Sequence, residues 1–436
     1  MTTPMRRMLA VVPLLLVGTL PSAGVAVPLA HREVLPSGAR LLVAPRPAIP
    51  IVVVRVYVRA GSVFDPPDAA GLANLTAELL TRGTAARTVP ELDRAIEFVG
   101  GSLESESGRD GSTLTLAVLR KDLDLGLDLL AEALLRPTFP EDELRRKVSD
   151  IQAAIERCEE NPEAVGGRAL ARLLYPGHPY AHPVTGTAES VGKLTREQVV
   201  GFHRARYRPD ATVIAVVGDV GVDEIRQALS RRLSGWTAPA SLDAPIPMAP
   251  PSPPVVAETI SRELTQATVY LGRPAIRQDH PDYFPLLVAN YILGGGSASR
   301  LYTRVRENAG LAYAVGSTLS PGRYGAACTV SLQTRVDGVA EAVRLVKDEM
   351  AAMGRAPVEE RDLDLAKSYL IGSFPLRLDT SAKVAETLTA IEEYDLGLDY
   401  PDRFKQAVAG VTRADVARVA ARYLDPATFS SVIVGK

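Results

Sequence analysis

The feature that most constrains the fold is an internal repeat. The segment "LTREQVVGFHRARYRPDATVIAVVGDV" (194–220) resembles "VTRADVARVAARYLDPATFSSVIVGK" (411–436). Each copy places a Thr before a charged helical turn, which is a favourable N-cap, and runs through a helix to an Arg-Tyr pair and then into a β-branched strand. Arg206 and Arg422, which open those pairs, are 216 positions apart. This period is too long for a solenoid unit and predicts a duplicated domain.

A second pair of segments supports the duplication. The segment "RKDLDLGLDLLAEALLRPTFPEDELRRKVSDI" (120–151) loosely matches residues 335–370, and both predict a helix, a short loop with Pro and a charged helix. Alternating apolar residues predict strands, with helical periodicity between them, at 50–62, 112–119, 212–220, 267–275 and 326–335. We therefore expect an α+β fold in which each domain is an antiparallel sheet with helices packed on one face.

The predicted domains are residues 27–236 and 258–436. Between them, residues 237–257 contain seven prolines, a density that favours an extended, semi-rigid strap. Residues 1–26 have a basic start, a short apolar run and small residues at Gly24-Val25-Ala26, as in a secretory signal peptide. We expect an exported protein, periplasmic or secreted, with no stable membrane span.

Composition argues against two classes of protein, those that bind nucleic acid through a strong net charge and those held together by several disulfides. The formal net charge of −2 provides no field that would gather nucleic acid. Cys158 and Cys328 are too few for a disulfide framework, so buried free thiols are expected rather than a bridge.

His178 and His182 have i, i+4 spacing, but neighbouring prolines argue against a helix and therefore against a shared metal site.

Four separated motifs identify a family resemblance. They are "GLA…GT" within 71–84, "GHPYAHPVTGT" (177–187), "RARYRPDATVIAVVGDV" (204–220) and "SRLYTRVRENAGLAYAVGS" (299–317). Together they resemble the insulinase-like, M16 group of zinc peptidases, which includes the mitochondrial processing peptidase subunits and the core proteins of the respiratory bc1 complex. The resemblance runs over nearly the whole chain after the leader.

The resemblance implies a helix that carries H-x-x-E-H in active members, with two His ligands, a Glu base and a later carboxylate ligand. Here Asn74 stands at the first His, Ala77 at the base and Glu78 at the second His. The third ligand position falls at Ala153 or Ala154. One amide and one carboxylate make no zinc site, and alanine cannot act as a base. We expect no metal in this chain.

The resemblance also implies an Arg/Tyr pair, seven residues apart, that is supplied by the C-terminal half or by a partner subunit. Arg306 and Tyr313 match it. Arg306 is expected to end a helix, Gly310 to allow a turn and Tyr313 to enter a strand. The guanidinium can bind substrate oxygens and the phenol can donate a hydrogen bond to an oxyanion.

Two glycine-containing segments are expected near bound peptide. Residues Gly294, Gly295 and Gly296 lack the G-K-[ST] ending of a phosphate loop and predict a close-approach loop beside the peptide cleft. The family places the strand near "GGSLESES" (100–107) at a sheet edge, beside extended substrate.

These features lead to three hypotheses. In the first, the chain is a catalytically incomplete M16 subunit that pairs with a homologue bearing H-x-x-E-H and zinc, and lends it Arg306 and Tyr313 for peptide hydrolysis. In the second, it is a non-catalytic structural or peptide-binding protein of the bc1 core type. A homodimer remains an alternative to the heterodimer, and a peptidase using other ligands is the third reading.

Overall fold

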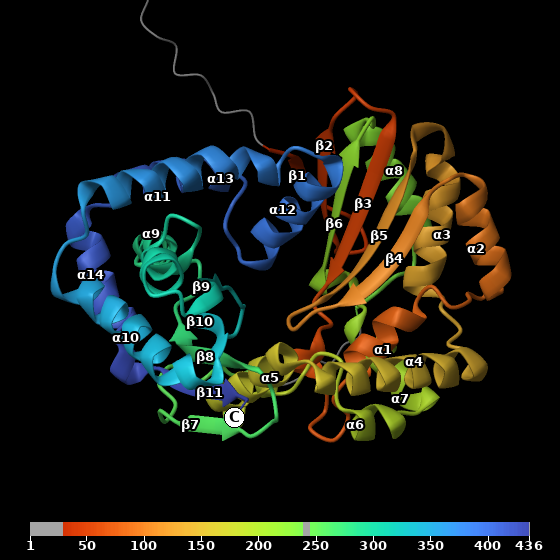
Figure 1. Ribbon diagram of the computed structural model, residues 1–436. Helices are drawn as coiled ribbons and strands as arrows, with labels where there is room; N and C mark the ends of the chain where they lie inside the picture. Colours follow the sequence, from red (N-terminus) through yellow and green to blue (C-terminus); the bar gives the residue numbers. More distant parts are fainter. Residues whose placement is uncertain (1–28, 239–244, 436) are drawn as a thin grey trace, which may run out of the picture.

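The computed structural model describes residues 29–238 and 245–435, which form two halves, each built on its own β-sheet (Figure 1). The predicted signal peptide and residues 239–244 of the strap lie outside the described residues. Residues 245–256 of the strap contain no helix or strand. A 2.7 Å hydrogen bond from Ala249 N to Tyr324 O ties this segment to the second half.

The first sheet has six strands in the order β1-β2-β6-β3-β5-β4. Every residue of its strand β6 is buried, because this apolar strand lies between β2 and β3. The strands are β1 (His31–Val34), β2 (Arg40–Pro45), β3 (Ile51–Val58), β4 (Ser102–Ser107), β5 (Ser112–Leu119) and β6 (Thr212–Gly218). The helices are α1 (Leu72–Leu79), α2 (Val89–Phe98), α3 (Leu123–Leu135), α4 (Glu141–Glu160), α5 (Pro162–Leu174), α6 (Ala188–Gly192), α7 (Arg196–Arg206) and α8 (Val222–Arg232), with single turns η1 (Ser62–Phe64), η2 (Arg120–Asp122), η3 (Pro179–Ala181) and η4 (Pro209–Ala211).

The second sheet has five strands in the order β7-β11-β8-β10-β9. They are β7 (Ala257–Ile260), β8 (Gln266–Ala275), β9 (Ala312–Ser320), β10 (Ala326–Arg335) and β11 (Ser430–Val434). The helices are α9 (Tyr283–Gly294), the π-helical η5 (Tyr302–Asn308), α10 (Val339–Arg355), α11 (Glu360–Ser373), α12 (Ser381–Glu393), α13 (Tyr400–Gly410) and α14 (Arg413–Tyr423), with turns η6 (Val336–Gly338), η7 (Phe374–Arg377) and η8 (Pro426–Thr428).

The repeat seen in the sequence is a repeat of structure. Thr195 and Thr412 cap the equivalent helices α7 and α14, each in a capping box. The α+β arrangement is confirmed, but the sheets are not wholly antiparallel. Strand β2 runs parallel to β6, and β7 runs parallel to β11. In each half, an early strand lies beside the last strand and points the same way, which the alternating pattern alone could not reveal.

The two halves exchange one helix each. Helix α5, from the first half, packs on β8 and β11 of the second sheet. Helix α12, from the second half, packs on β3 and β6 of the first sheet, where Val384, Ala385 and Leu388 are fully buried. The expectation of helices on one face therefore holds only for the helices that belong to the same half. On the other face of each sheet, one helix from the opposite half packs on two of the strands (Figure 1).

Two glycines allow the exchanged helix α5 to lie close to the second sheet. A Cβ on Gly166 of α5 would lie 2.8 Å from the ring of Tyr270, and a Cβ on Gly272 would lie 2.8 Å from Leu170. Both distances are shorter than real side chains tolerate. Glycine at these two positions therefore permits α5 to lie directly on β8.

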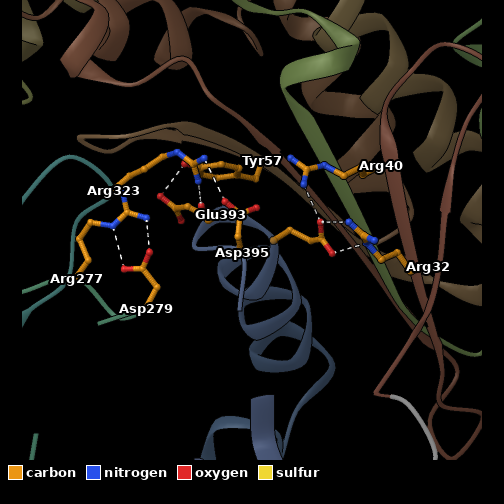
Figure 2. A network of polar contacts seen from close by, with 9 residues as sticks. Arg32, Arg40, Tyr57, Arg277, Asp279, Arg323, Glu393 and Asp395 are labelled. Atoms are coloured by element: carbon orange, nitrogen blue, oxygen red, sulfur yellow. Dashed lines mark hydrogen bonds and ion pairs between the residues drawn. The ribbon is translucent and has the colours of Figure 1, made fainter. Parts of the chain in front are cut away.

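Polar contacts fix the C-terminal end of α12 against the first half (Figure 2). Glu392, whose side chain is 6% exposed, forms ion pairs with Arg32 at 2.7 Å and with Arg40 at 2.9 Å. The Tyr57 hydroxyl donates to Glu393 at 2.7 Å. Two guanidinium partners compensate for the desolvation of Glu392, so this end of α12 is held by charge as well as by apolar packing.

Candidate functional site

Helix α1 carries the positions where zinc ligands are expected. It starts after Gly71, whose φ of 97° is in the left-handed region. The Asp65 carboxylate accepts hydrogen bonds of 2.8 Å from Gly71 N and Ala73 N, and so caps the helix. Burial raises the pKa of Asp65 to about 7, while the two backbone donors lower it. The start of the helix is therefore fixed by a buried carboxylate.

The three degenerate positions do not fit zinc. The Asn74 amide donates to Glu78 at 3.1 Å, and the Lys147 ammonium of α4 lies 3.1 Å from the other Glu78 oxygen. Ala77 is fully buried. A metal-binding carboxylate would have to give up these two partners, and the Lys147 charge would repel a cation. The network is complete without a metal.

Helix α4 supplies no third ligand at the expected place. Ala153 and Ala154 lie on it half-buried and offer no donor atom. Among residues 29–238 and 245–435, no group of three His, Cys, Asp or Glu side chains is arranged to hold a metal ion. Sequence reasoning located the degenerate helix but missed Lys147, whose position 69 residues after Glu78 carries no local signal.

The structure brings Arg306 and Tyr313 together in the second half. Arg306 lies in the π-helical η5, Gly310 turns the chain with a φ of 62°, and Tyr313 lies in the edge strand β9. The Arg306 guanidinium carbon is 5.0 Å from the centre of the Tyr313 ring and 4.7 Å from that of Tyr302. The predicted local geometry is therefore correct.

Both side chains are available to a ligand. The Tyr313 side chain is 78% exposed. Arg306 has no ion pair to any residue that the structure describes, so only the two aromatic rings hold its guanidinium. Cation–π contacts orient the guanidinium while leaving its N–H donors free. At Glu78, by contrast, both carboxylate oxygens already have partners within the chain.

The glycine segment after α9 is explained in part by packing. A Cβ on Gly294 would lie 2.4 Å from Ser317 N of β9, and one on Gly295 would lie 2.6 Å from Tyr291 Cα. Gly294 is buried, whereas Gly295 is exposed. The segment is a close-approach loop against β9, the strand that carries Tyr313. Peptide binding by Gly294, Gly295 and Gly296 stays a prediction.

The remaining sequence candidates have other roles. His178 and His182 flank the turn η3 and share no helical face, and the His178 ring contacts Pro247 O at 3.0 Å. Cys158 and Cys328 are free. Cys328 is buried, which raises its pKa to about 12, but Cys158 is exposed, so the expectation of two buried thiols is wrong for Cys158. Its position near the end of the charged helix α4 explains the exposure.

Two family models match the chain in succession. Residues 40–188 match the model described as Insulinase (Peptidase family M16), and residues 193–370 match the one described as Peptidase M16 inactive domain. A Mycobacterium leprae protein named an uncharacterized zinc protease is 30% identical over 83% of this chain and 80% of its own length. The chain belongs to the M16 peptidase family.

Solved structures of other bacterial proteins share its architecture. A crystal structure described as the peptidase M16 inactive domain from Pseudomonas fluorescens superimposes with a TM-score of 0.87 and 29% identity, covering 93% of this chain and 98% of that one. A protease from Helicobacter pylori has a TM-score of 0.85, covering 94% of this chain and 100% of its own, but 18% identity, so it supports the fold alone. The described helices of this M16 chain are all too short or too polar to cross a bilayer.

The M16 chain also has a cavity of about 500 Å³ between its halves that sequence reasoning missed. The hairpin joining β4 and β5, the loop before β10 and helix α12 line it. Strand β4 is at the edge of its sheet, as predicted. The acidic groups contributed by α12 had no signal in the sequence, because nothing there predicts that α12 crosses to the first sheet.

Proposed function

We propose that this chain is the non-zinc subunit of a heterodimeric M16 peptidase, which lends Arg306 and Tyr313 to the active site of a homologous chain bearing H-x-x-E-H. The observation that carries the proposal is the pairing of an exposed Tyr313 with an Arg306 that has no ion pair among the described residues. The cofactor zinc belongs to the partner. In this proposal the chain is exported, with its mature start near Val27.

The roles of the two residues follow from their chemistry. The Arg306 guanidinium binds carbonyl or carboxylate oxygens of the peptide, because its planar donors match such oxygens. The Tyr313 phenol donates a hydrogen bond to the carbonyl oxygen that gains negative charge during hydrolysis. The two cation–π contacts of the guanidinium reduce the entropy lost when peptide binds.

The first half supports an accessory role. Lys147 and Asn74 satisfy Glu78, and Ala77 offers no base, so peptide hydrolysis in this chain alone has no metal ligand set or proton acceptor at the expected place. We expect the isolated chain to bind far less than one zinc ion per molecule by elemental analysis. Stoichiometric zinc in the isolated chain would contradict the proposal.

The experiment mixes this chain with an exported M16 homologue from the same organism that carries H-x-x-E-H and measures peptide hydrolysis. The mixture should be active and each chain alone inactive. Arg306→Ala and Tyr313→Phe should each abolish most of the rate, while Tyr369→Phe, an exposed tyrosine of the same half, should not. Full activity of both variants in an active mixture would refute the assignment. A stable complex that binds peptide without cleaving it would favour the non-catalytic alternative.

A further inference from the structure

A cavity of about 410 Å³ lies within the second half, where η7 meets helices α12 and α13. The described residues that line it all come from the segment 278–400, so the cavity is separate from the one between the halves. Its volume is in the range of small-molecule sites, about 300–1,000 Å³. We call it the η7 cavity and ask which ligand its lining would hold.

One cationic side chain of the η7 cavity lies over buried aromatic rings. The Arg377 guanidinium carbon is 5.6 Å from the ring centres of both Phe374 and Phe404, which are themselves 4.5 Å apart. Its N–H groups form no hydrogen bond or ion pair with any residue in the described ranges. The rings therefore orient the guanidinium and leave its donors free, and this planar set of donors matches a carboxylate.

A buried hydroxyl provides a second donor. Tyr400 lines the η7 cavity and is 8% exposed, yet its hydroxyl has no hydrogen bond to the part of the chain that the structure describes. Burial raises the pKa of Tyr400, whereas the charges of Arg377 and Arg403 lower it. The phenol therefore keeps its proton at neutral pH and lies close enough to Arg377 to feel its charge. A buried phenol of this kind needs an acceptor.

Apolar side chains form the wall beside these two donors. Ile391 of α12 and Leu396 are buried, and Leu376 of η7 is exposed where the cavity opens to solvent. A hydrocarbon group in contact with them leaves water, which strengthens binding by about three- to fourfold for each buried methylene. The lining thus combines an anion site with an apolar surface.

The remaining charges limit the ligand to one carboxylate. The Lys383 ammonium already donates to Asp379 at 3.0 Å and to the Leu376 carbonyl oxygen at 2.9 Å. Among the described residues that line the cavity, Arg377 is therefore the one cation without a partner. Glu386 also lines the cavity, and its carboxylate disfavours a second negative charge on the ligand.

We propose that the η7 cavity binds a small monocarboxylic acid with an apolar body. The carboxylate accepts hydrogen bonds from Arg377 and Tyr400, and the hydrocarbon part packs on Leu376 and Ile391. The site contains none of the residues of the proposed heterodimeric active site and does not depend on that function.

The test is isothermal titration calorimetry of the mature chain with octanoate and three related compounds. Octanoate should bind. Octanamide, which has no charge, should bind about tenfold more weakly or worse, because it loses the charge-assisted contact. Hexanoate should also bind about tenfold more weakly, because it buries two methylenes fewer, and octanedioate should bind more weakly than octanoate. Failure of octanoate to bind at millimolar concentration, or equal affinity of octanamide or octanedioate, would overturn the proposal.

Variants then locate the two ends of the acid. Arg377 is exposed, so Arg377→Gln should fold normally; it should weaken octanoate about tenfold and leave octanamide unchanged. Tyr400→Phe keeps the buried ring and should weaken octanoate about fivefold. Leu376→Ser should weaken octanoate and octanamide equally. Arg361→Gln and Leu365→Ser, two exposed positions on α11, are matched controls that should change neither affinity. Unchanged octanoate affinity in Arg377→Gln, or an equal loss in Arg361→Gln, would refute the site.

Discussion

The two halves of the molecule share a fold and differ in how their polar side chains are satisfied. In the first half, Asn74, Glu78 and Lys147 contact one another and leave no group for a metal. In the second half, Arg306 and Tyr313 contact each other only through ring and guanidinium, and their donors remain free. The polar groups around Glu78 all have partners within the chain, whereas the hydrogen-bond donors of Arg306 and Tyr313 are free to bind a ligand. Function in this chain is therefore expected in the second half.

The largest expected effect tests the open pair of the second half. Tyr313→Phe removes a single donor and should lower kcat of the mixed enzyme by about 10²–10³. The KM should change little if the phenol acts mainly in the transition state. Steady-state kinetics of the mixture gives both values. A rise in KM with unchanged kcat would assign Tyr313 to peptide binding instead.

The next effect tests whether the halves depend equally on the exchanged helices. Leu388→Ala on α12 and Leu170→Ala on α5 each truncate a buried side chain that packs on the sheet of the other half. Each should reduce the free energy of unfolding by about 2–5 kcal/mol. Urea denaturation followed by circular dichroism measures the loss. A loss below 1 kcal/mol for one variant alone would indicate that its sheet does not need the exchanged helix.

A smaller effect concerns pH at the junction of the halves. Burial raises the pKa of Glu393 to about 7, and Asp110 adds to this, whereas Tyr57, Arg323 and Arg55 lower it. The folded form therefore binds a proton that the unfolded form has released, so stability falls as pH rises from about 4.5 to 7.

For Glu393 alone this loss is on the order of 2–3 kcal/mol. Thermal unfolding between pH 4.5 and 8 measures it, and Glu393→Gln should flatten that part of the profile. The raised pKa of Asp65 acts with the same sign, so some slope should remain in the variant. An unchanged slope in Glu393→Gln would show that this carboxyl does not titrate in the range.

The smallest effect tests the closed network of the first half. Lys147→Met leaves the half-buried Glu78 carboxylate without its cation and should cost about 1 kcal/mol of stability. Adding Glu78→Gln should recover most of it, because the neutral amide needs no counter-charge. Denaturant midpoints of the single and double variants measure the coupling. Strictly additive losses would mean that the two side chains do not interact.

The sequence predicted the local features and missed the long-range ones. The capping residues Thr195 and Thr412, the turn at Gly310 and the approach of Arg306 to Tyr313 depend on near neighbours, and their patterns were visible. Lys147 near Glu78, the parallel strand pairs and the acidic cavity beside α12 depend on contacts between distant segments. No periodicity records such contacts, because they arise only when the elements pack.

The helix exchange has a consequence for the order in which the chain can fold during synthesis. Val432 and Val434 of β11, which form part of the apolar cluster around α5, come more than 250 residues after Leu174, the end of that helix. Helix α5 is therefore synthesised long before the second sheet, on which it packs. The first sheet is likewise synthesised before α12, the helix that packs on it. Such distant pairings slow folding and expose apolar surface meanwhile. We expect neither half to form its native core when it is expressed alone.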